Sequence, residues 1–454
     1  MKKFIAGCIA AYVATIYTPT SAIAAVSTEE AGLLKTTLTP MGSERAANKD
    51  GTIPAWNGGY ATTSSGFKPG ERRTDPFAGE KPLYSITAQN VGQYAEKLSD
   101  GQVAMFKKYP NYRMDIYPTH RTANAPQWVY DNIYKNATRA KATNGGNSIE
   151  GAYGGIPFPI PKAAYEVMWN HNLRWNGEAW AKDTNVYVTS SDGKRFLASS
   201  NTVESQSPYY YKDGSAETFK QEYAYLKMIT TGPAQKVGEV ILVKDPMDQA
   251  GVGRQAWQYL TGQRRVRKAP SFAYDTPSPA SSGQANFDEI YLFNGAFDRY
   301  DWKIFGKKEV YLPYNNNKFS LAKLDSDVMG ERFLNPDHVR WELHRAWVVE
   351  ANLVPGKRHV LPKRRFYVDE DTWFAMLADG WDAKGQLSKT FWFQNIVATD
   401  LPGVVAGVSG HYDLQTGSWM ANDMTNEKAT QIKFRSRWPE SYFTPDAMAA
   451  DGVR

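Results

Sequence analysis

The chain has 454 residues, with 53 Lys and Arg against 47 Asp and Glu, a formal net charge of +6, and 42% hydrophobic residues. This is the composition of an ordinary globular protein, so it excludes disorder, collagen-like repeats and a strongly basic nucleic-acid-binding chain. Aromatic residues reach 13%, which favours strands and surfaces that hold apolar or sugar-like ligands. A single Cys excludes a disulfide framework and a structural zinc site.

Residues 1–24 are typical of a secretory signal peptide. Lys2 and Lys3 form the charged start, an apolar stretch follows, and small residues at 22 and 24 place cleavage before Ala25. Cys8 resembles a lipidation site, but too few apolar residues precede it. No later segment approaches the ~18 apolar residues that span a bilayer. We therefore expect a protein exported to the periplasm.

Residues 25–150 are predicted to form an irregular N-terminal arm with short helices, because Gly and Pro are frequent from 40 to 80. An apolar stripe predicts a helix over 91–98, and Ser99 with Gln102 forms a capping box that opens the next helix. A further helix is predicted over 161–176, with Gly177 as its stop.

Residues 151–454 are predicted to form one β domain. No long helical patterns alternate with the strands, so we expect a mainly β fold with some α, in which a large antiparallel sheet or barrel carries helices on one side. Residues 290–293, followed by Asn294-Gly295, are interpreted as a strand leading into a hairpin. The other predicted strands are 186–188, 240–243, 256–260, 308–312, 339–354, 364–368 and 431–438.

Signatures of the common enzyme classes are absent, which predicts no catalytic residues and no cofactor. His338 and His344 are predicted to lie on the polar face of one strand as surface residues, because no third metal ligand accompanies them. The acidic run 369–371 is interpreted as a strand-end turn, since adjacent strand residues point to opposite faces.

The segment 338–354 alternates apolar and polar residues over an unusual length. Its odd positions carry Trp341, Arg345 and Trp347, and its even positions begin with polar residues. This pattern predicts one face on an apolar interior and the other on water. Arg345 interrupts the apolar row. It is expected either to pair with an internal carboxylate, to leave the row at a bulge, or to line a cavity and bind the polar head of a ligand.

Several motifs then resemble a known family. The stretches 38–45, 50–56, 155–159, 257–267 and 344–350 resemble an uncharacterised family of exported proteobacterial proteins, over nearly the whole mature chain. The strand with Trp257 and Tyr259, followed by Arg264-Arg265-Val266, also resembles the outer-membrane lipoprotein-sorting proteins LolA and LolB. That resemblance implies an unclosed antiparallel β half-barrel with helices on its concave side, which holds a lipid or acyl chain. It also implies an RND-type exporter and an outer-membrane protein as partners.

The leading hypothesis is a non-enzymatic periplasmic carrier that binds a lipid or another hydrophobic small molecule, at or near the outer membrane, without nucleic acid. Its predicted ligand-binding residues are Trp257, Tyr259, Trp341, Arg345 and Trp347. The alternative is a secreted carbohydrate-binding or carbohydrate-active protein, which would need an open groove with two carboxylates ~5–10 Å apart. A third hypothesis, an adaptor between an exporter and the outer membrane, predicts no ligand cavity.

Overall fold

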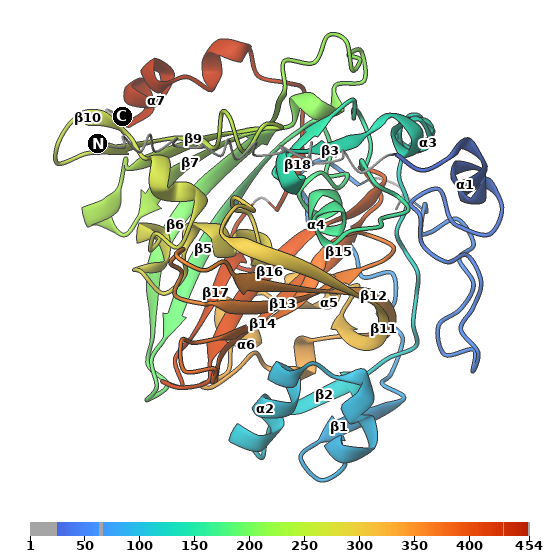
Figure 1. The fold of residues 1–454 in the computed structure, drawn as a ribbon. Coiled ribbons are helices and arrows are strands. Elements are labelled where there is room, and N and C mark those ends of the chain that lie inside the picture. The colour runs from blue at the N-terminus through green and yellow to red at the C-terminus, as the bar shows by residue number, and fades with distance from the viewer. Residues whose placement is uncertain (1–24, 63–66, 430, 453–454) are drawn as a thin grey trace, which may run out of the picture.

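The computed structural model of the protein describes residues 25–62, 67–429 and 431–452. The predicted signal peptide, with Cys8, lies outside these residues. A single 16-stranded sheet dominates the molecule (Figure 1). Within the described residues, every helix is too short or too polar to cross a bilayer.

Two antiparallel meanders build this sheet. The first comprises β5 (Ala179–Thr189), β6 (Arg195–Gln206), β7 (Glu222–Gly232), β8 (Val240–Pro246), β9 (Gln255–Leu260) and β10 (Arg265–Lys268). The second comprises β11 (Tyr300–Pro313), β12 (Trp341–Leu353), β13 (Lys363–Asp369), β14 (Ala375–Trp381), β15 (Leu387–Ala398), β16 (Gly403–Asp413) and β17 (Trp419–Met424). They join where β17 pairs with β5, with Trp419 opposite Thr189.

The sheet is unclosed, because no pairing between described strands connects β10 to the opposite edge. Apart from one parallel contact, between Trp341 and Ile116, the strands pair antiparallel. The predicted fold class, mainly β with some α and with a large unclosed antiparallel sheet, is therefore confirmed.

The N-terminal arm is built into the same sheet. Its strands β1 (Tyr84–Thr87) and β2 (Arg113–Ile116) extend the sheet beyond β12, and they lie with α2 (Asp100–Lys108) at one end of the molecule (Figure 1). The arm also carries α1 (Thr28–Gly32), the 3-10 helix η2 (Val91–Lys97), α3 (Gln127–Arg139) and the hairpin of β3 (Lys141–Thr143) with β4 (Ser148–Glu150).

The predicted capping box at the start of α2 is confirmed. The Ser99 hydroxyl accepts a hydrogen bond from the Gln102 backbone at 3.1 Å, and the Gln102 side chain accepts one from the Ser99 backbone at 2.8 Å. Gly101 allows α2 to approach the sheet, since a Cβ there would lie 2.1 Å from the Asp379 carboxylate of β14. The helix therefore rests directly on the sheet.

Helices lie on both faces of the sheet, so the prediction of helices on one side only, the concave side, is wrong. α7 (Pro445–Gly452) packs against Leu242 of β8, whereas the neighbouring residues Ile241 and Val243 point to the other face. α4 (Ala164–Asn172), the helix predicted over 161–176, lies on this second face. There His171 donates from Nε2 to the carbonyl of Phe293 at 3.1 Å and accepts at Nδ1 from the backbone N–H of Ala375 at 3.0 Å.

Two strand predictions are wrong. Residues 290–293 lie at the end of the 3-10 segment η8 (Phe287–Leu292) and form no hairpin, because the chain there crosses the sheet instead of pairing with a strand. Arg364 of β13 donates to the Leu292 carbonyl at 2.7 Å and holds this course. Within 431–438 only β18 (Lys433–Phe434) is a strand.

The prediction of a solvent-facing side for β12 is also wrong. Glu342 is 0% and His344 1% exposed, because the arm and the end of β11 cover the even-numbered face. The backbone N–H of His120 donates to Glu342 at 2.8 Å, and Tyr314 stacks on His344 with ring centroids 3.8 Å apart. His344 is therefore not a surface histidine. The predicted strand-end turn at 369–371 is confirmed, since β13 ends at Asp369.

Candidate functional site

The segment 269–299 between the two meanders crosses one face of the sheet, and we call it the cover segment. It contains the 3-10 turns η6 (Pro270–Ala273), η7 (Pro279–Ser281) and η8. Polar contacts from strands and turns attach it: Arg254 donates to the Phe272 carbonyl and Lys236 to the Pro279 carbonyl, both at 3.0 Å. Backbone hydrogen bonds hold the two ends of the cover segment, from Ala269 to the Ala256 carbonyl at 2.7 Å and from Val354 to the Arg299 carbonyl at 2.9 Å, and side chains hold the course between them.

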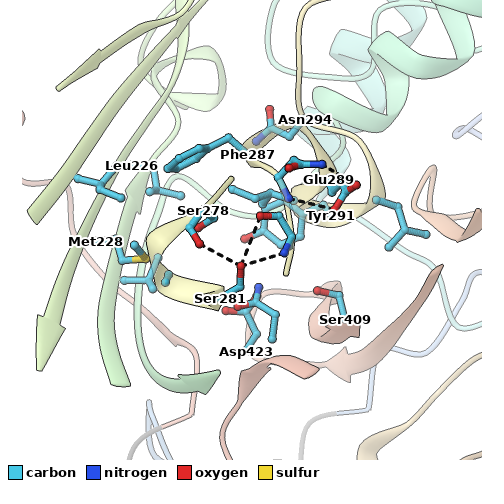
Figure 2. A pocket seen from close by; sticks show the side chains of 18 of the residues that line it. Leu226, Met228, Ser278, Ser281, Phe287, Glu289, Tyr291, Asn294, Ser409 and Asp423 are labelled. Carbon is cyan, nitrogen blue, oxygen red and sulfur yellow. Dashed lines mark hydrogen bonds between the residues drawn. The ribbon is translucent and has the colours of Figure 1, made fainter. Parts of the chain in front are cut away.

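A cavity of about 120 Å³ lies between the cover segment and the sheet. Figure 2 shows Leu226 and Met228 on the strands at one side of it, and Ser409 and Asp423 on the strands at the other. The pairing register places Val203, Met228 and Ile241 side by side on this face of β6, β7 and β8. The remaining apolar lining includes Val243, Ala280, Phe287, Ile290, Leu292, Phe391 and Met420.

The acidic side chains around this cavity are neutralised by cations. Asp245 pairs with Arg254 at 2.6 Å and Asp423 with Lys182 at 3.0 Å. Glu289 lies 3.4 Å from Lys389. The cavity therefore presents apolar walls and paired charges.

His411 adds a polar group to the wall. Burial lowers the pKa of its imidazole well below the usual range, and the nearby Lys389 acts in the same direction. The ring is therefore neutral. It makes no side-chain hydrogen bond to any residue that the structure describes, which leaves it available to a ligand.

A second cavity of about 90 Å³ adjoins the first. Leu226, Asp245, Tyr291 and Asn294 line both. The second cavity has a more polar wall, formed in part by Arg174 and Asn176, which follow α4, and by Tyr223 of β7. Together the two cavities offer an apolar compartment with a polar extension.

The structure does not bring the five sequence-predicted ligand residues together at this site. Trp257 and Tyr259 lie on the opposite face of the sheet, because β9 pairs them with Leu242 and Val240, which pack with α7. Tyr259 is buried in that second core. Neither residue lines either cavity.

The three predicted residues of β12 lie apart from the cavity as well. Trp341 is buried and borders a separate space of about 20 Å³ with Tyr112 and Trp392. Trp347 is half-buried beneath the ammonium group of Lys307, 5.0 Å from its ring centroid.

Arg345 pairs with an internal carboxylate, which is one of the three arrangements that the sequence allowed for it. Its Nε donates to Glu370 at 2.6 Å, and its Nη2 donates to the carbonyls of Glu44 and Ala46 at 3.1 and 3.0 Å. It is absent from the walls of both cavities. These contacts support a structural role for Arg345.

Arg345 belongs to a buried charged cluster that the sequence analysis missed. The cluster brings together the following residues: Arg121, Arg340, Glu342, His344, Arg345, Asp369, Glu370 and Asp371. His344, Asp369 and Asp371 approach one another closely enough for a metal ion. However, Arg121 occupies both oxygens of Asp371, at 2.8 and 2.6 Å, so the donor set suits an ion-pair network and not a metal site.

Residues 85–449 match a family model described as "Protein of unknown function (DUF1329)". The chain belongs to this family. A relative of similar length is the uncharacterised protein PA3922 of Pseudomonas aeruginosa, 40% identical over 441 residues that cover 96% of both chains. The predicted membership of an uncharacterised family is thereby confirmed.

Three solved structures resemble the DUF1329 chain more distantly, each covering 63% of it. A putative outer membrane lipoprotein-sorting protein domain from Vibrio parahaemolyticus is 14% identical, with 98% of its own length covered and a TM-score of 0.44. A DUF1329 family protein from Desulfovibrio piger is 16% identical, with 97% covered and a TM-score of 0.42. A LolA superfamily protein, NE2245 from Nitrosomonas europaea, is 14% identical, with 100% covered and a TM-score of 0.37.

Proposed function

We propose that this protein is a non-enzymatic carrier that binds a hydrophobic small molecule, such as the acyl chain of a lipid, beneath the cover segment. The observation that carries the proposal is the apolar cavity walled by β6, β7 and β8. The pattern of residues 1–24 supports a periplasmic location, and the family resemblance supports an RND-type exporter and an outer-membrane protein as partners.

The cavity chemistry favours a carrier over a carbohydrate-active enzyme. Glycoside hydrolysis needs two free carboxyl groups facing a groove. Here Asp245, Glu289 and Asp423 each face a cation, and the cover segment lies over the space between them. Each of these carboxylates already binds a cation, so binding is the activity that this site suits.

The size of the cavity indicates how a ligand is accommodated. An apolar protein cavity of about 150 Å³ holds a benzene-sized molecule, so the cavity here admits a ring or a short piece of alkyl chain. We infer that a longer chain enters when the cover segment shifts. Its polar attachments near the cavity include the hydrogen bonds from Lys236 and Arg254, which can break and re-form separately, whereas Phe272 and Phe287 pack in one cluster with Ile241 and Val243 of the sheet.

Filling the cavity tests the proposal. Met228→Trp places a bulky ring at the centre of the wall, and we expect at least a tenfold weaker affinity for the apolar fluorescent probe 1-N-phenylnaphthylamine. Phe196→Trp is the matched control, because Phe196 is 48% exposed on β6 and lines neither cavity. Fluorescence titration of the three folded proteins measures the affinities. Unchanged binding by Met228→Trp, or no binding by the wild-type protein, would refute the proposed site.

A further inference from the structure

Arg174, which follows α4, differs from the other buried arginines of the described residues. Only 8% of it is exposed, yet it makes no ion pair. The others each lie within hydrogen-bonding distance of a carboxylate: Arg73, Arg121, Arg254, Arg340, Arg345 and Arg364. A buried charge without a counter-ion is unfavourable. No carboxylate of the described chain neutralises Arg174, so an anion from outside the chain could pair with it.

The guanidinium of Arg174 also retains unused donors. Nη1 donates to the carbonyl of His171, and Nε has no hydrogen-bond partner among the described residues. Its neighbours are aromatic, with Cζ 4.1 Å from the ring centroid of Phe374 and 5.1 Å from that of Tyr291. These rings hold the guanidinium in place and leave its edge free for an acceptor.

Arg174 lines the second cavity, where the other charged group is already neutralised. Asp245 lines the same cavity, but both its oxygens accept from Arg254, at 2.6 and 2.9 Å. Tyr223 and Tyr291 also line this space, and their hydroxyls make no hydrogen bond within the described chain. Burial lowers the pKa of Arg174 to about 10, so the guanidinium remains charged at neutral pH.

We propose that Arg174 binds the anionic head group of the hydrophobic ligand, a carboxylate or a phosphate, while the apolar part of that ligand occupies the larger cavity. This inference rests on the proposed function. Because Leu226 and Tyr291 line both cavities, one amphiphile can reach from the apolar walls to the guanidinium. Arginine presents a planar fork of donors that matches either anion, and the two tyrosine hydroxyls add further donors.

Three probes with the same twelve-carbon chain test the assignment: dodecanoate, dodecyl phosphate and the neutral dodecanol. Each is titrated by calorimetry into the wild-type protein, Arg174→Met and Arg174→Lys, the two anions below their micelle concentrations and dodecanol below its solubility limit. Arg265→Met serves as the control, since it removes the same charge from an exposed site with no ion pair in the described residues. Thermal unfolding confirms that each variant is folded.

We expect the wild-type protein and Arg265→Met to bind at least one anion ten times more tightly than dodecanol. Arg174→Met should lose that tenfold preference while its dodecanol affinity stays unchanged, and Arg174→Lys should keep only part of it because the fork is lost. The more tightly bound anion identifies the head group as carboxylate or phosphate.

Equal wild-type affinity for all three probes would refute the role of Arg174 and leave the proposed carrier function intact. Failure of the wild-type protein to bind any of them would refute both. A parallel loss of dodecanol binding in Arg174→Met would mean that Arg174 only supports the structure, and would also overturn the assignment.

Discussion

At the scale of single residues, the arginines of the buried charged cluster differ in how much stability the protein loses when each is substituted. Glu370 binds Arg345 at 2.6 Å but also Lys307 at 2.7 Å, so losing Arg345 leaves the carboxylate paired. We expect Arg345→Leu to lower the free energy of unfolding by about 1.5–3 kcal/mol, the contribution of a hydrogen bond to a charged group. Because Arg345 lies outside both cavities, the Arg345→Leu protein should bind 1-N-phenylnaphthylamine as tightly as the wild-type protein does.

Arg121→Met provides the comparison, since Arg121 makes the bidentate pair with Asp371. Breaking a buried pair from one side typically costs about 3–5 kcal/mol, so this variant should be less stable than Arg345→Leu. Urea denaturation measures both. A loss of probe binding in folded Arg345→Leu would restore the ligand-anchoring role that the sequence suggested for it.

Alternation along 338–354 was sufficient to predict β12, but not what covers each of its faces. Glu342 and His344 look like solvent-facing residues because their partners, His120 and Tyr314, lie far away in the sequence. Likewise, Trp257 and Tyr259 were correctly placed on a strand but lie on the face opposite to the cavity. Local periodicity predicts that two faces exist, whereas the choice of face depends on long-range packing.

At the scale of elements, Asp379 connects α2 to the sheet. Its carboxylate accepts from the Gly101 backbone at 3.0 Å and from the Thr390 hydroxyl at 2.9 Å. Burial nevertheless raises the pKa of Asp379 to about 6. The carboxyl group of an unfolded chain titrates near ~3.9, so the folded state binds this proton more tightly. The resulting stabilisation is complete below about pH 4 and is lost as the pH rises through about 6.

Asp379→Asn removes this titration. The wild-type free energy of unfolding minus that of Asp379→Asn should therefore decrease by roughly 2–3 kcal/mol between about pH 4 and pH 7.5, since each pKa unit corresponds to ~1.4 kcal/mol. Urea denaturation of both proteins across this range measures the difference. A difference that stays constant with pH would mean that Asp379 titrates normally in the fold.

The elements also show which sequence signals are reliable. The cap of α2 was predictable because Ser99 and Gln102 satisfy each other within one turn. The cover segment was not, because its course depends on Arg254, Lys236 and Arg364, which lie outside it. Asn294-Gly295 has the composition of a hairpin turn. However, Arg364 binds the carbonyl of Leu292 just before it, and this long-range contact overrides the local preference for a hairpin.

At the scale of the whole molecule, the sheet type was predictable and the strand order was not. Frequent strands without alternating helices indicated an antiparallel sheet. Because β17 pairs with β5, the meander that comes later in the sequence precedes the earlier one in the strand order of the sheet. No short sequence pattern predicts that these two strands pair. The cavity beneath the cover segment lies across the same junction, since strands of both meanders line it.

The junction of β17 with β5 has a consequence for the order of folding. Neighbouring strands within each meander are close in sequence, whereas Trp419 and Thr189 must meet across a very long intervening chain. Closing a long loop is entropically unfavourable before its contacts form, so each meander should assemble first. In pulsed hydrogen exchange during refolding, amides that pair β7 with β8 should gain protection before those that pair β17 with β5. Simultaneous protection would contradict this sequence of events. Because both meanders line the cavity beneath the cover segment, we expect this cavity to be among the last features of the protein to form.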